Sequence, residues 1–352
     1  MSKVRIGFVG VGTMGQMAHL RNYAVLEDCE VVALADPRAE TVARVAERYG
    51  VPTTYSDHHA LLDAEELDGV VAVLPFNRHA AVLPDLYGRV PCLFTEKPLA
   101  VGVEAGRRLA RAAEEAGCVH MVGYHKRSDP ATERAIEVLS RWRSTGEVGA
   151  LRYVRITMPP GEWVQGGFTG LIDEGETKPS DATEPPPDDM PEEQAQDYVA
   201  FVNYYIHQVN LLRHLMGEPY RVTHADESGV LLVAEGESGT AGVIEMAPYR
   251  TSRTWEESAL VAFERGYVHL ELPAPMALNR AGSVEVYQDP EDEEPQRLRP
   301  VLPPVHAMRR QAENFVTVCR GDKDPPCAPE EAVEDLVVAR DYIRMRFGTQ
   351  TD

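Results

Sequence analysis

The sequence predicts an α/β protein in two parts: an N-terminal Rossmann domain with a doubly wound parallel sheet, and a C-terminal α+β domain with a large, mostly antiparallel sheet. Three observations support this prediction. The chain opens with a short apolar strand, a glycine turn and a helix. Continuous apolar runs, typical of strands buried on both faces, then alternate with helical segments. Further on, apolar and polar residues alternate with a period of two, as in a sheet with one covered face.

The length of 352 residues is too great for most single hydrophobic cores. We therefore expect one domain at 1–125 and a second at 126–352. The second contains a segment rich in Pro, Gly and acidic residues at 166–196. Loops of this length are usually functional lids or disordered segments. A solvated insertion, a lid and an arm to a neighbouring subunit all remain open.

Residues 3–36 combine a strand, a glycine turn, a helix expected over 16–26 and a second strand that ends at an acidic residue. This context is the one that a dinucleotide-binding fingerprint requires. The first glycine permits the tight turn, the second lets the backbone approach a pyrophosphate, and the third lets the helix pack close to the strand. A glycine turn that binds nothing is the alternative. The turn residues expected to bind the cofactor are Gly10, Gly12, Thr13, Met14 and Gly15.

Asp36 lies at the end of the second strand, where a carboxylate accepts hydrogen bonds from the adenosine ribose. Its negative charge would repel the 2′-phosphate of NADP. The expected cofactor is therefore NAD, although Arg38 nearby leaves some room for NADP.

The formal net charge of −21 argues against nucleic acid or an anionic membrane as a partner. No apolar stretch is long enough to cross a bilayer, and the first residues lack the apolar core of a signal peptide. The five cysteines show no C-x-x-C pair and no metal-ligand spacing. We expect a cytoplasmic protein without a metal site, because reduced and merely packed cysteines are typical of the cytosol.

Periodicity and capping residues place the remaining elements of the first domain. The helices are expected over 38–49, 58–63, 80–87 and 103–116, and the strands over 70–74, 91–95 and 119–122. Ligands of such folds bind where the strands end at their carboxyl edge. Three strand ends carry polar residues, at 75–79, 96–98 and 123–127. Polar residues often simply end strands, but their shared edge favours a binding site.

The second domain begins with a helix expected over 130–143 and a turn containing Gly146 and Gly149. Trp163, which precedes the acidic segment, is a candidate for stacking on a sugar ring. The strands are expected over 151–157, 229–234, 240–246, 258–263, 267–272 and 283–287, and the last helices over 306–320 and 329–346.

One long helix is expected over 197–216, ended by Gly217. It carries two asparagines and two histidines with spacings that place them on one helical face. Spacing alone does not separate a solvated stripe from a functional cluster. The four residues are Asn203, His207, Asn210 and His214.

With these residues in place, nearly the whole chain resembles the glucose–fructose oxidoreductase / inositol dehydrogenase (Gfo/Idh/MocA) family. The most specific element is Glu96-Lys97-Pro98 at its distance from the glycine turn. The resemblance implies that Lys97 lies between the nicotinamide and the substrate hydroxyl, and that the Lys97–Pro98 peptide is cis. It also implies that Arg127 reaches the substrate. The strand-end residues expected around the nicotinamide ribose are Asn77, His79 and Glu96, and Pro75 is a further expected cofactor-binding residue.

Members of the family commonly carry an aspartate four residues before a histidine on a helix that faces this lysine. His207 matches the histidine, whereas Asn203 stands where the aspartate is expected. A neutral Asn203 cannot raise the pKa of a histidine as a carboxylate would, but it can still orient a hydroxyl or an imidazole. We expect His207 to be the general base and Lys97 to stabilise the alkoxide. The expected substrate-binding residues are Lys97, Tyr124, Arg127, Trp163, Asn203 and His207.

The expected function is NAD-dependent hydride transfer at a secondary hydroxyl or ketone of a sugar, a sugar derivative or a cyclitol. Two alternatives stay open. One is a hydrolase or lyase that oxidises a sugar carbon only transiently to cleave a glycosidic bond. The other is a redox sensor that binds NAD without catalysis. The expected partners are a small carbohydrate or cyclitol and further copies of the chain, in a homodimer or homotetramer.

Overall fold

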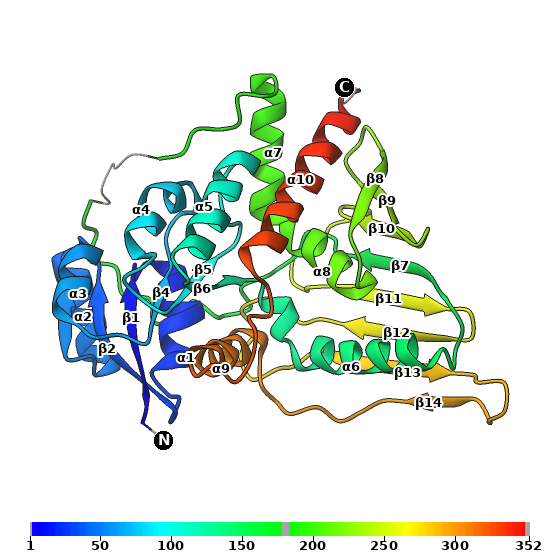
Figure 1. Ribbon diagram of the computed structural model, residues 1–352, viewed down its shortest axis with the longest axis horizontal. Helices are drawn as coiled ribbons and strands as arrows, with labels where there is room; N and C mark the ends of the chain where they lie inside the picture. Colours follow the sequence, from blue (N-terminus) through cyan, green and yellow to red (C-terminus); the bar gives the residue numbers. More distant parts are fainter. Residues whose placement is uncertain (1, 178–182, 349–352) are drawn as a thin grey trace. The chain divides into compact units, whose positions relative to one another are not determined.

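The computed structural model describes residues 2–177 and 183–348, which form two compact units (Figure 1). The first unit comprises residues up to Tyr124, together with Gly166–Pro187 and Met308–Leu336, and the second unit holds the rest. The division therefore differs from two contiguous domains that meet at 125/126. The chain returns to the first unit twice, with a segment of the acidic insertion and with part of its last two helices.

The first unit contains a six-stranded sheet in the order β3-β2-β1-β4-β5-β6, and every neighbouring pair is parallel. This confirms the doubly wound parallel sheet. The strand order reverses between β1 and β4, which is where such folds bind ligands. Only the short β3 was not expected. The strands are β1 Val4–Val9, β2 Cys29–Ala35, β3 Thr53–Tyr55, β4 Gly69–Ala72, β5 Cys92–Glu96 and β6 Val119–Gly123.

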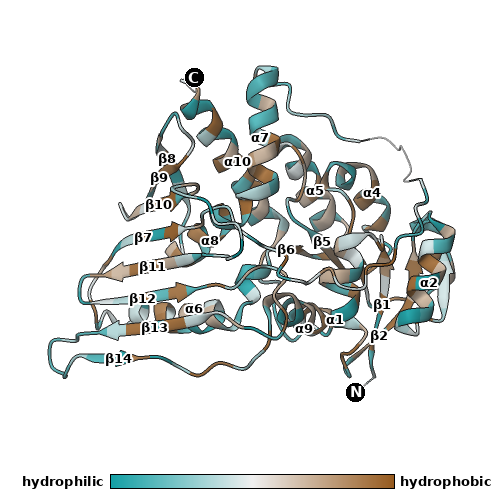
Figure 2. Cartoon of the chain, turned by 180° about the vertical axis from the view of Figure 1, so that it is seen from behind, coloured by the Kyte–Doolittle hydropathy of each residue, from teal (hydrophilic) through white to brown (hydrophobic). Residues whose placement is uncertain are grey.

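Helices surround this sheet, and Figure 2 shows hydrophilic and hydrophobic residues together on the outer helix α2. The helix expected over 16–26 is instead a π-helix followed by a short α-helix. The helices of this part are the π-helix η1 Gly15–Leu20, α1 Arg21–Tyr23, α2 Ala39–Tyr49, α3 His58–Ala64, the 3₁₀-helix η2 Phe76–Arg78, α4 His79–Leu86 and α5 Val103–Glu115.

The late helix α9, Ala307–Cys319, supplies Phe315 to the core of the first unit. The Phe315 ring lies 5.7 Å from Phe94 of β5 and 6.4 Å from Tyr23, centroid to centroid. Tyr23 in turn meets Phe8 of β1 edge to face at 5.3 Å. These apolar contacts explain why a segment more than 300 residues along the chain belongs to this unit.

The second unit contains an eight-stranded sheet in the order β14-β13-β12-β11-β7-β10-β9-β8. Neighbours are antiparallel except β7 and β10, so the expectation of a mostly antiparallel sheet is confirmed. Strands β8 and β14 were not expected. The bounds are β7 Leu151–Thr157, β8 Tyr220–Ala225, β9 Leu231–Gly236, β10 Ala241–Glu245, β11 Ser258–Phe263, β12 Gly266–Glu271, β13 Ser283–Gln288 and β14 Gln296–Leu298.

The single helix expected over 197–216 is wrong, because two helices meet at Tyr205. They are α7, Glu192–Tyr204, and α8, Ile206–Met216. Tyr205 has φ −97° and ψ −2°, and its hydroxyl donates a hydrogen bond of 2.6 Å to the Met246 carbonyl. This tertiary contact accompanies the break. Asn203 and His207 consequently belong to different helices.

The remaining helices of this part include the 3₁₀-helix η3, His125–Ser128, and α6, Pro130–Thr145, while α10, Pro329–Arg346, contributes to both units. Of the segment expected as an insertion at 166–196, residues 178–182 lie outside the described part. Its last residues, from Glu192 onward, begin α7. Within the described ranges, none of the helices combines the length and apolar composition needed to pass through a bilayer.

Candidate functional site

The glycine turn after β1 is shaped by close backbone approach. Gly10 has φ +92°, and a Cβ there would lie 2.4 Å from the Val73 carbonyl oxygen. A Cβ at Gly15 would lie 2.4 Å from the Gly10 carbonyl oxygen. A Cβ at Gly12 would instead meet nothing closer than 3.9 Å, where it would approach Arg38. Two glycines therefore serve packing, and Gly12 borders open space at the start of the helix.

Asp36, at the end of β2, is held by the protein on both carboxylate oxygens. The Val11 amide donates a hydrogen bond of 2.9 Å to Oδ2, and the Arg38 guanidinium bonds both oxygens at 2.7 and 2.8 Å. Burial opposes ionisation of Asp36, but the hydrogen bonds from Arg38 and Val11 prevail and lower its pKa. Arg38, expected only to lie nearby, thus closes a bidentate ion pair.

These residues fit the diphosphate and ribose of a dinucleotide. The space beside Gly12 leaves room for the diphosphate at a helix N-terminus, where free N–H groups favour an anion. The ionised Asp36 carboxylate lies next to it and is joined to the turn through Val11. This edge of the sheet can therefore hold a bound anion and a ribose hydroxyl side by side.

The end of β5 carries a buried, hydrogen-bonded pair, Glu96 and His19. The Glu96 carboxylate lies 2.7 Å from His19 Nε2 and also accepts the Lys97 amide at 3.2 Å. Burial raises the pKa of Glu96, but its hydrogen bond and charge interaction with His19 prevail and lower it. The Lys97–Pro98 peptide is cis, as expected. His19 was missed, because nothing in its local sequence marks it as the partner of a residue 77 positions away.

The polar residues after β4 divide into two groups. Pro75 is exposed and Asn77 is half-buried, in and beside the 3₁₀ turn η2. His79 is fully buried, and its Nδ1 lies 3.0 Å from the Leu99 carbonyl oxygen. A carbonyl only accepts, so Nδ1 carries the proton. Burial lowers the pKa of His79 to about 4, which keeps the ring neutral beneath the loop that bears Lys97.

The second unit has its own buried polar cluster, at the end of η3. Lys126 Nζ lies 2.5 Å from Glu257 Oε2, and both side chains are almost fully buried. Gln208 donates to the other Glu257 oxygen at 2.7 Å, and the Trp255 indole donates to Oε2 at 3.2 Å. No local sequence pattern indicates this pair, which joins residues 131 positions apart.

Helix α8 brings several expected residues to the same neighbourhood. The Arg127 guanidinium donates a hydrogen bond of 2.6 Å to Asn210 Oδ1, with both residues buried. The His207 ring meets His125 edge to face, 4.5 Å between centroids. His207 is half-buried, whereas Asn203 on α7 is exposed. The four polar residues expected on one helical face thus do not form a uniform solvated stripe.

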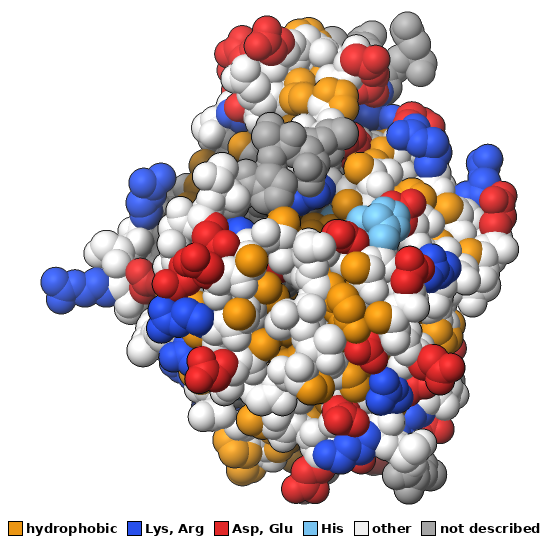
Figure 3. Space-filling model, turned by 90° about the vertical axis from the view of Figure 1, so that its left-hand side faces the viewer, with side chains coloured by type: hydrophobic (Ala, Val, Ile, Leu, Met, Phe, Trp, Pro, Cys, Tyr) orange, Lys and Arg blue, Asp and Glu red, His pale blue; other side chains and the backbone are white. Residues whose placement is uncertain are grey.

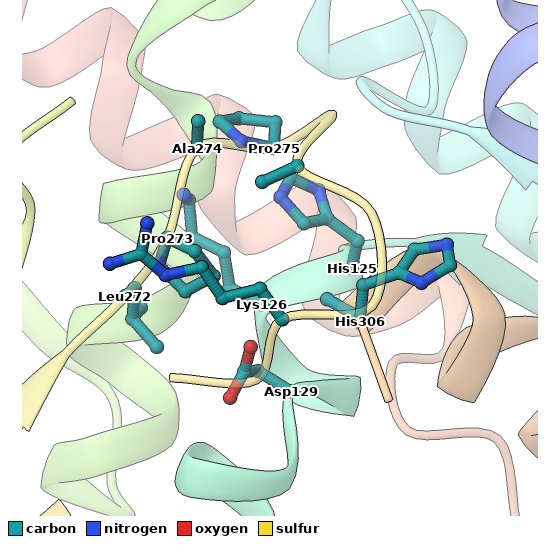
Figure 4. Close-up of a pocket in the computed structure, with 11 residues that line it drawn as sticks. His125, Lys126, Asp129, Leu272, Pro273, Ala274, Pro275 and His306 are labelled. Carbon is teal, nitrogen blue, oxygen red and sulfur yellow. The ribbon is translucent and has the colours of Figure 1, made fainter. Parts of the chain in front are cut away.

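Two cavities lie in the second unit. The larger, of about 620 Å³, is lined by Trp255, Tyr249, Glu256, Glu257 and Glu271, among others. Trp163 does not line either cavity. The Trp163 carbonyl accepts the Met276 amide at 3.2 Å. The aromatic residues at the larger cavity are Tyr249 and Trp255, which the sequence did not single out. The smaller pocket, shown in Figure 4, is lined by His125, Lys126, Asp129 and His306.

Tyr124 is fully buried at the end of the first unit, and Lys97 also belongs to that unit. Arg127, Asn203 and His207 belong to the second.

The described residues also hold one cluster with metal-ligand character, formed by His58, His59 and Asp85 with their ligand atoms within 4.8 Å of one another. Both histidines face the Asp85 carboxylate, at 3.1 and 3.6 Å.

Comparison with known proteins finds a family match within the first unit. Residues 4–124 match the family described as an oxidoreductase family with an NAD-binding Rossmann fold. Myo-inositol 2-dehydrogenase of Thermotoga maritima is 26% identical over 249 residues, which cover 69% of this chain and 63% of that protein. NAD-dependent scyllo-inositol 2-dehydrogenase of Bacillus subtilis is 24% identical over 265 residues, covering 71% and 68%.

The fold of the whole chain also has solved counterparts. An NAD-binding oxidoreductase from Klebsiella pneumoniae superposes with a TM-score of 0.74 at 19% identity, covering 99% of this chain and 98% of that structure. The chain therefore has the same two-part architecture. Its sequence match spans slightly less than two thirds of the Thermotoga maritima relative.

Proposed function

We propose that this chain, a member of the Gfo/Idh/MocA oxidoreductase family, is an NAD-dependent dehydrogenase of sugars, sugar derivatives or cyclitols. It transfers a hydride between the nicotinamide and a secondary hydroxyl or ketone of the substrate. The observation that carries the proposal is the joint placement of the glycine turn, Asp36 and Lys97 after strands β1, β2 and β5 of one parallel sheet. The inositol dehydrogenases named above supply the substrate class.

Each residue has a role that follows from its chemistry. Gly10, Gly12, Thr13, Met14 and Gly15 form the turn that receives the diphosphate, and Asp36 binds the ribose. Lys97 stabilises the negative charge that develops on the substrate oxygen. His207 accepts the hydroxyl proton, because an imidazole has its pKa near the working pH. The bound nicotinamide supplies the hydride acceptor.

The remaining site residues position these groups. Glu96 bonds both His19 and the Lys97 amide, which orients the lysine loop. His79 supports the same loop through Leu99. Arg127 and Asn210 form a buried pair that presents a cation to the substrate side of the second unit. We assign further substrate contacts to Tyr124, Trp163 and Asn203.

We propose NAD rather than NADP as the cofactor. An arginine beside the ribose accommodates a 2′-phosphate in NADP enzymes. Here the Arg38 guanidinium is already bonded to both oxygens of Asp36. A 2′-phosphate would have to displace the carboxylate and lie next to its negative charge.

A substrate panel tests the activity. Sugars, sugar acids and cyclitols are incubated with NAD or NADP, and the nicotinamide absorbance is followed. NADH formation with at least one member of the panel is expected. Cleavage of a glycoside without net NADH would support the transient-oxidation alternative instead. Strong NADP preference would overturn the role given to Asp36.

Replacing Lys97 with alanine tests the catalytic assignment. The variant is expected to lose at least about 100-fold in kcat, because it lacks the cation that stabilises the alkoxide, while it still binds NADH. Binding is measured by titrating nicotinamide fluorescence. Near-normal turnover of the true substrate by Lys97→Ala would show that the lysine does not have this role.

We also propose a homodimer or homotetramer formed through the large sheet. Along β7, Val154 and Ile156 are buried, whereas Tyr153 and Arg155 on the other face are only half-buried. Helices α6 and α8 contact this sheet. Size-exclusion chromatography with light scattering gives the mass, and a monomer at micromolar concentration would refute the proposal.

A further inference from the structure

A segment of the acidic insertion lies along the ligand-binding edge of the first unit. We call residues 170–177 the acidic strap. Ile172 exchanges two hydrogen bonds with the Gln16 side chain, of 2.8 and 3.0 Å, just after the glycine turn. The Arg48 guanidinium donates to the Gly170 carbonyl, and Arg44 forms an ion pair with Glu174. The strap is therefore attached to the π-helix after β1 and to helix α2 after β2.

Glu176 of the strap occupies the N-terminus of α2. Its two carboxylate oxygens accept the amides of Glu40 and Thr41, at 3.1 and 2.8 Å. Helix α2 spans Ala39–Tyr49, so these are the second and third residues of an 11-residue helix. Its N-cap residue, Arg38, makes no side-chain capping bond. Glu176 thus supplies from a distant segment the acceptor that the cap residue does not provide.

The charges around Arg38 show what this contact does to the ribose end of the site. The pKa of Arg38 is raised, first by its hydrogen bonds with Asp36 and further by the charges of Asp36, Asp173 and Glu176. The charges of three carboxylates, of which Asp36 is in direct contact, therefore act on one guanidinium. Figure 3 shows the side of the molecule on which α2 lies in Figure 1, with acidic and basic side chains interspersed.

We infer that Glu176 is a cofactor-specificity residue, which excludes the 2′-phosphate of NADP from the end of β2. The inference rests on the proposed function and assigns to the insertion a role that the glycine turn and Asp36 do not require. Glu176 acts in two ways. It occupies the amides of Glu40 and Thr41, which would otherwise be free to bind a phosphate. It also places a negative charge near Arg38, whose guanidinium is bonded to both oxygens of Asp36.

The size of the effect follows from Coulomb's law. A 2′-phosphate carries roughly 1.5 to 2 negative charges near neutral pH. At about 6 Å in a water-like dielectric, its repulsion by one carboxylate weakens binding about tenfold. NAD has a neutral hydroxyl at the same position, so its affinity does not depend on this charge. Glu176 therefore changes the ratio of the two affinities rather than the affinity for dinucleotides in general.

Two substitutions separate the charge of Glu176 from its capping role. Glu176→Gln removes the charge but keeps one oxygen that accepts an amide of α2. Glu176→Ala removes both and leaves the two amides open to a phosphate. Glu174→Gln is the matched control, because Glu174 lies on the same strap but pairs with Arg44. The full-length proteins are titrated with NADH and NADPH without substrate, by nicotinamide fluorescence and calorimetry. Displacement by 5′-AMP or adenosine 2′,5′-bisphosphate isolates the phosphate.

The wild type and Glu174→Gln are expected to bind NADH more tightly than NADPH. The ratio of the Kd for NADPH to the Kd for NADH should be the same in both proteins. Glu176→Gln should lower the Kd for NADPH about tenfold, and Glu176→Ala should lower it further, with the Kd for NADH within about threefold of wild type. If Glu176→Gln and Glu176→Ala bind NADPH with unchanged affinity and still bind NADH, the inference about Glu176 is overturned, but the proposed function is not. Equal losses for both dinucleotides would also overturn it, because Glu176 would then only support α2. A wild type that binds neither dinucleotide would refute the proposed function, and the inference with it.

Discussion

The free energy of unfolding of the second unit is predicted to fall between pH 4.5 and 7.5, and replacing Asp129 with asparagine is predicted to remove most of this fall. Asp129 is buried at the N-terminus of α6, where it accepts the Ala131 amide at 2.8 Å. It also accepts the Gly282 amide at 3.0 Å. Burial raises the pKa of Asp129 to about 6, although these hydrogen bonds and the charge of Lys126 act in the opposite direction. The ionised carboxylate is therefore the disfavoured form in the folded protein.

The sign and size of the change in unfolding free energy with pH follow from the linkage between protonation of Asp129 and folding. The pKa of about 6 in the folded protein exceeds the ordinary value of about 3.9 for an unfolded aspartate. The stabilising contribution is therefore fully present below about pH 4 and is lost as the pH rises through 6. Two pKa units correspond to about 3 kcal/mol, of which about 2 kcal/mol is lost between pH 4.5 and 7.5. Asparagine keeps a capping oxygen and stays neutral throughout.

Urea unfolding followed by tryptophan fluorescence measures this effect. The chain has three tryptophans, Trp142, Trp163 and Trp255, and all of them lie in the second unit. The free energy of unfolding of the wild type should fall between pH 4.5 and 7.5 by about 2 kcal/mol more than that of Asp129→Asn. Asp57→Asn, which alters an exposed helix cap in the first unit, is the control and should follow the wild type. Parallel pH profiles for Asp129→Asn and the wild type would refute the reasoning.

Two further pairs of substitutions test the packing of each unit. Gly15→Ala places a Cβ 2.4 Å from the Gly10 carbonyl and should cost roughly 1–3 kcal/mol of stability, visible as a lower Tm. In Gly12→Ala the new Cβ meets nothing closer than 3.9 Å, so the variant should keep its Tm but bind NADH more weakly. Normal NADH affinity of Gly12→Ala would argue against a diphosphate beside Gly12. In the second unit, Lys126→Met leaves the buried Glu257 carboxylate without its cation and should cost about 3–5 kcal/mol in urea unfolding. Adding Glu257→Gln should recover part of that loss, and a double variant no more stable than Lys126→Met would contradict the explanation.

Features that depend on adjacent residues were predicted well. A few consecutive residues encode each of these features: the glycine turn, the apolar parallel strands and the Glu96-Lys97-Pro98 element. The helix expected over 197–216 failed for the opposite reason. Its residues favour a helix throughout, and the break at Tyr205 accompanies a hydrogen bond to Met246, which no local pattern contains.

Partners that are distant in sequence escaped prediction. His19 bonds Glu96 from 77 positions away, and Lys126 bonds Glu257 from 131 positions away. Any histidine or carboxylate could have been chosen for either pair on sequence alone. The aromatic residues at the larger cavity of the second unit are Tyr249 and Trp255 rather than Trp163 for the same reason, since tertiary packing selects which side chain lines a cavity.

The sequence by itself determined the parallel sheet, the edge at which such folds bind ligands and the type of residue at the end of each strand, because hydrophobic periodicity and glycine geometry act over a few neighbouring residues. Tertiary structure alone decided how those residues are used. It ties Arg38 to Asp36 on both oxygens and brings Glu176 from the insertion onto helix α2. Whether a carboxylate binds a ligand, caps a helix or neutralises an arginine depends on which groups folding brings within hydrogen-bonding distance.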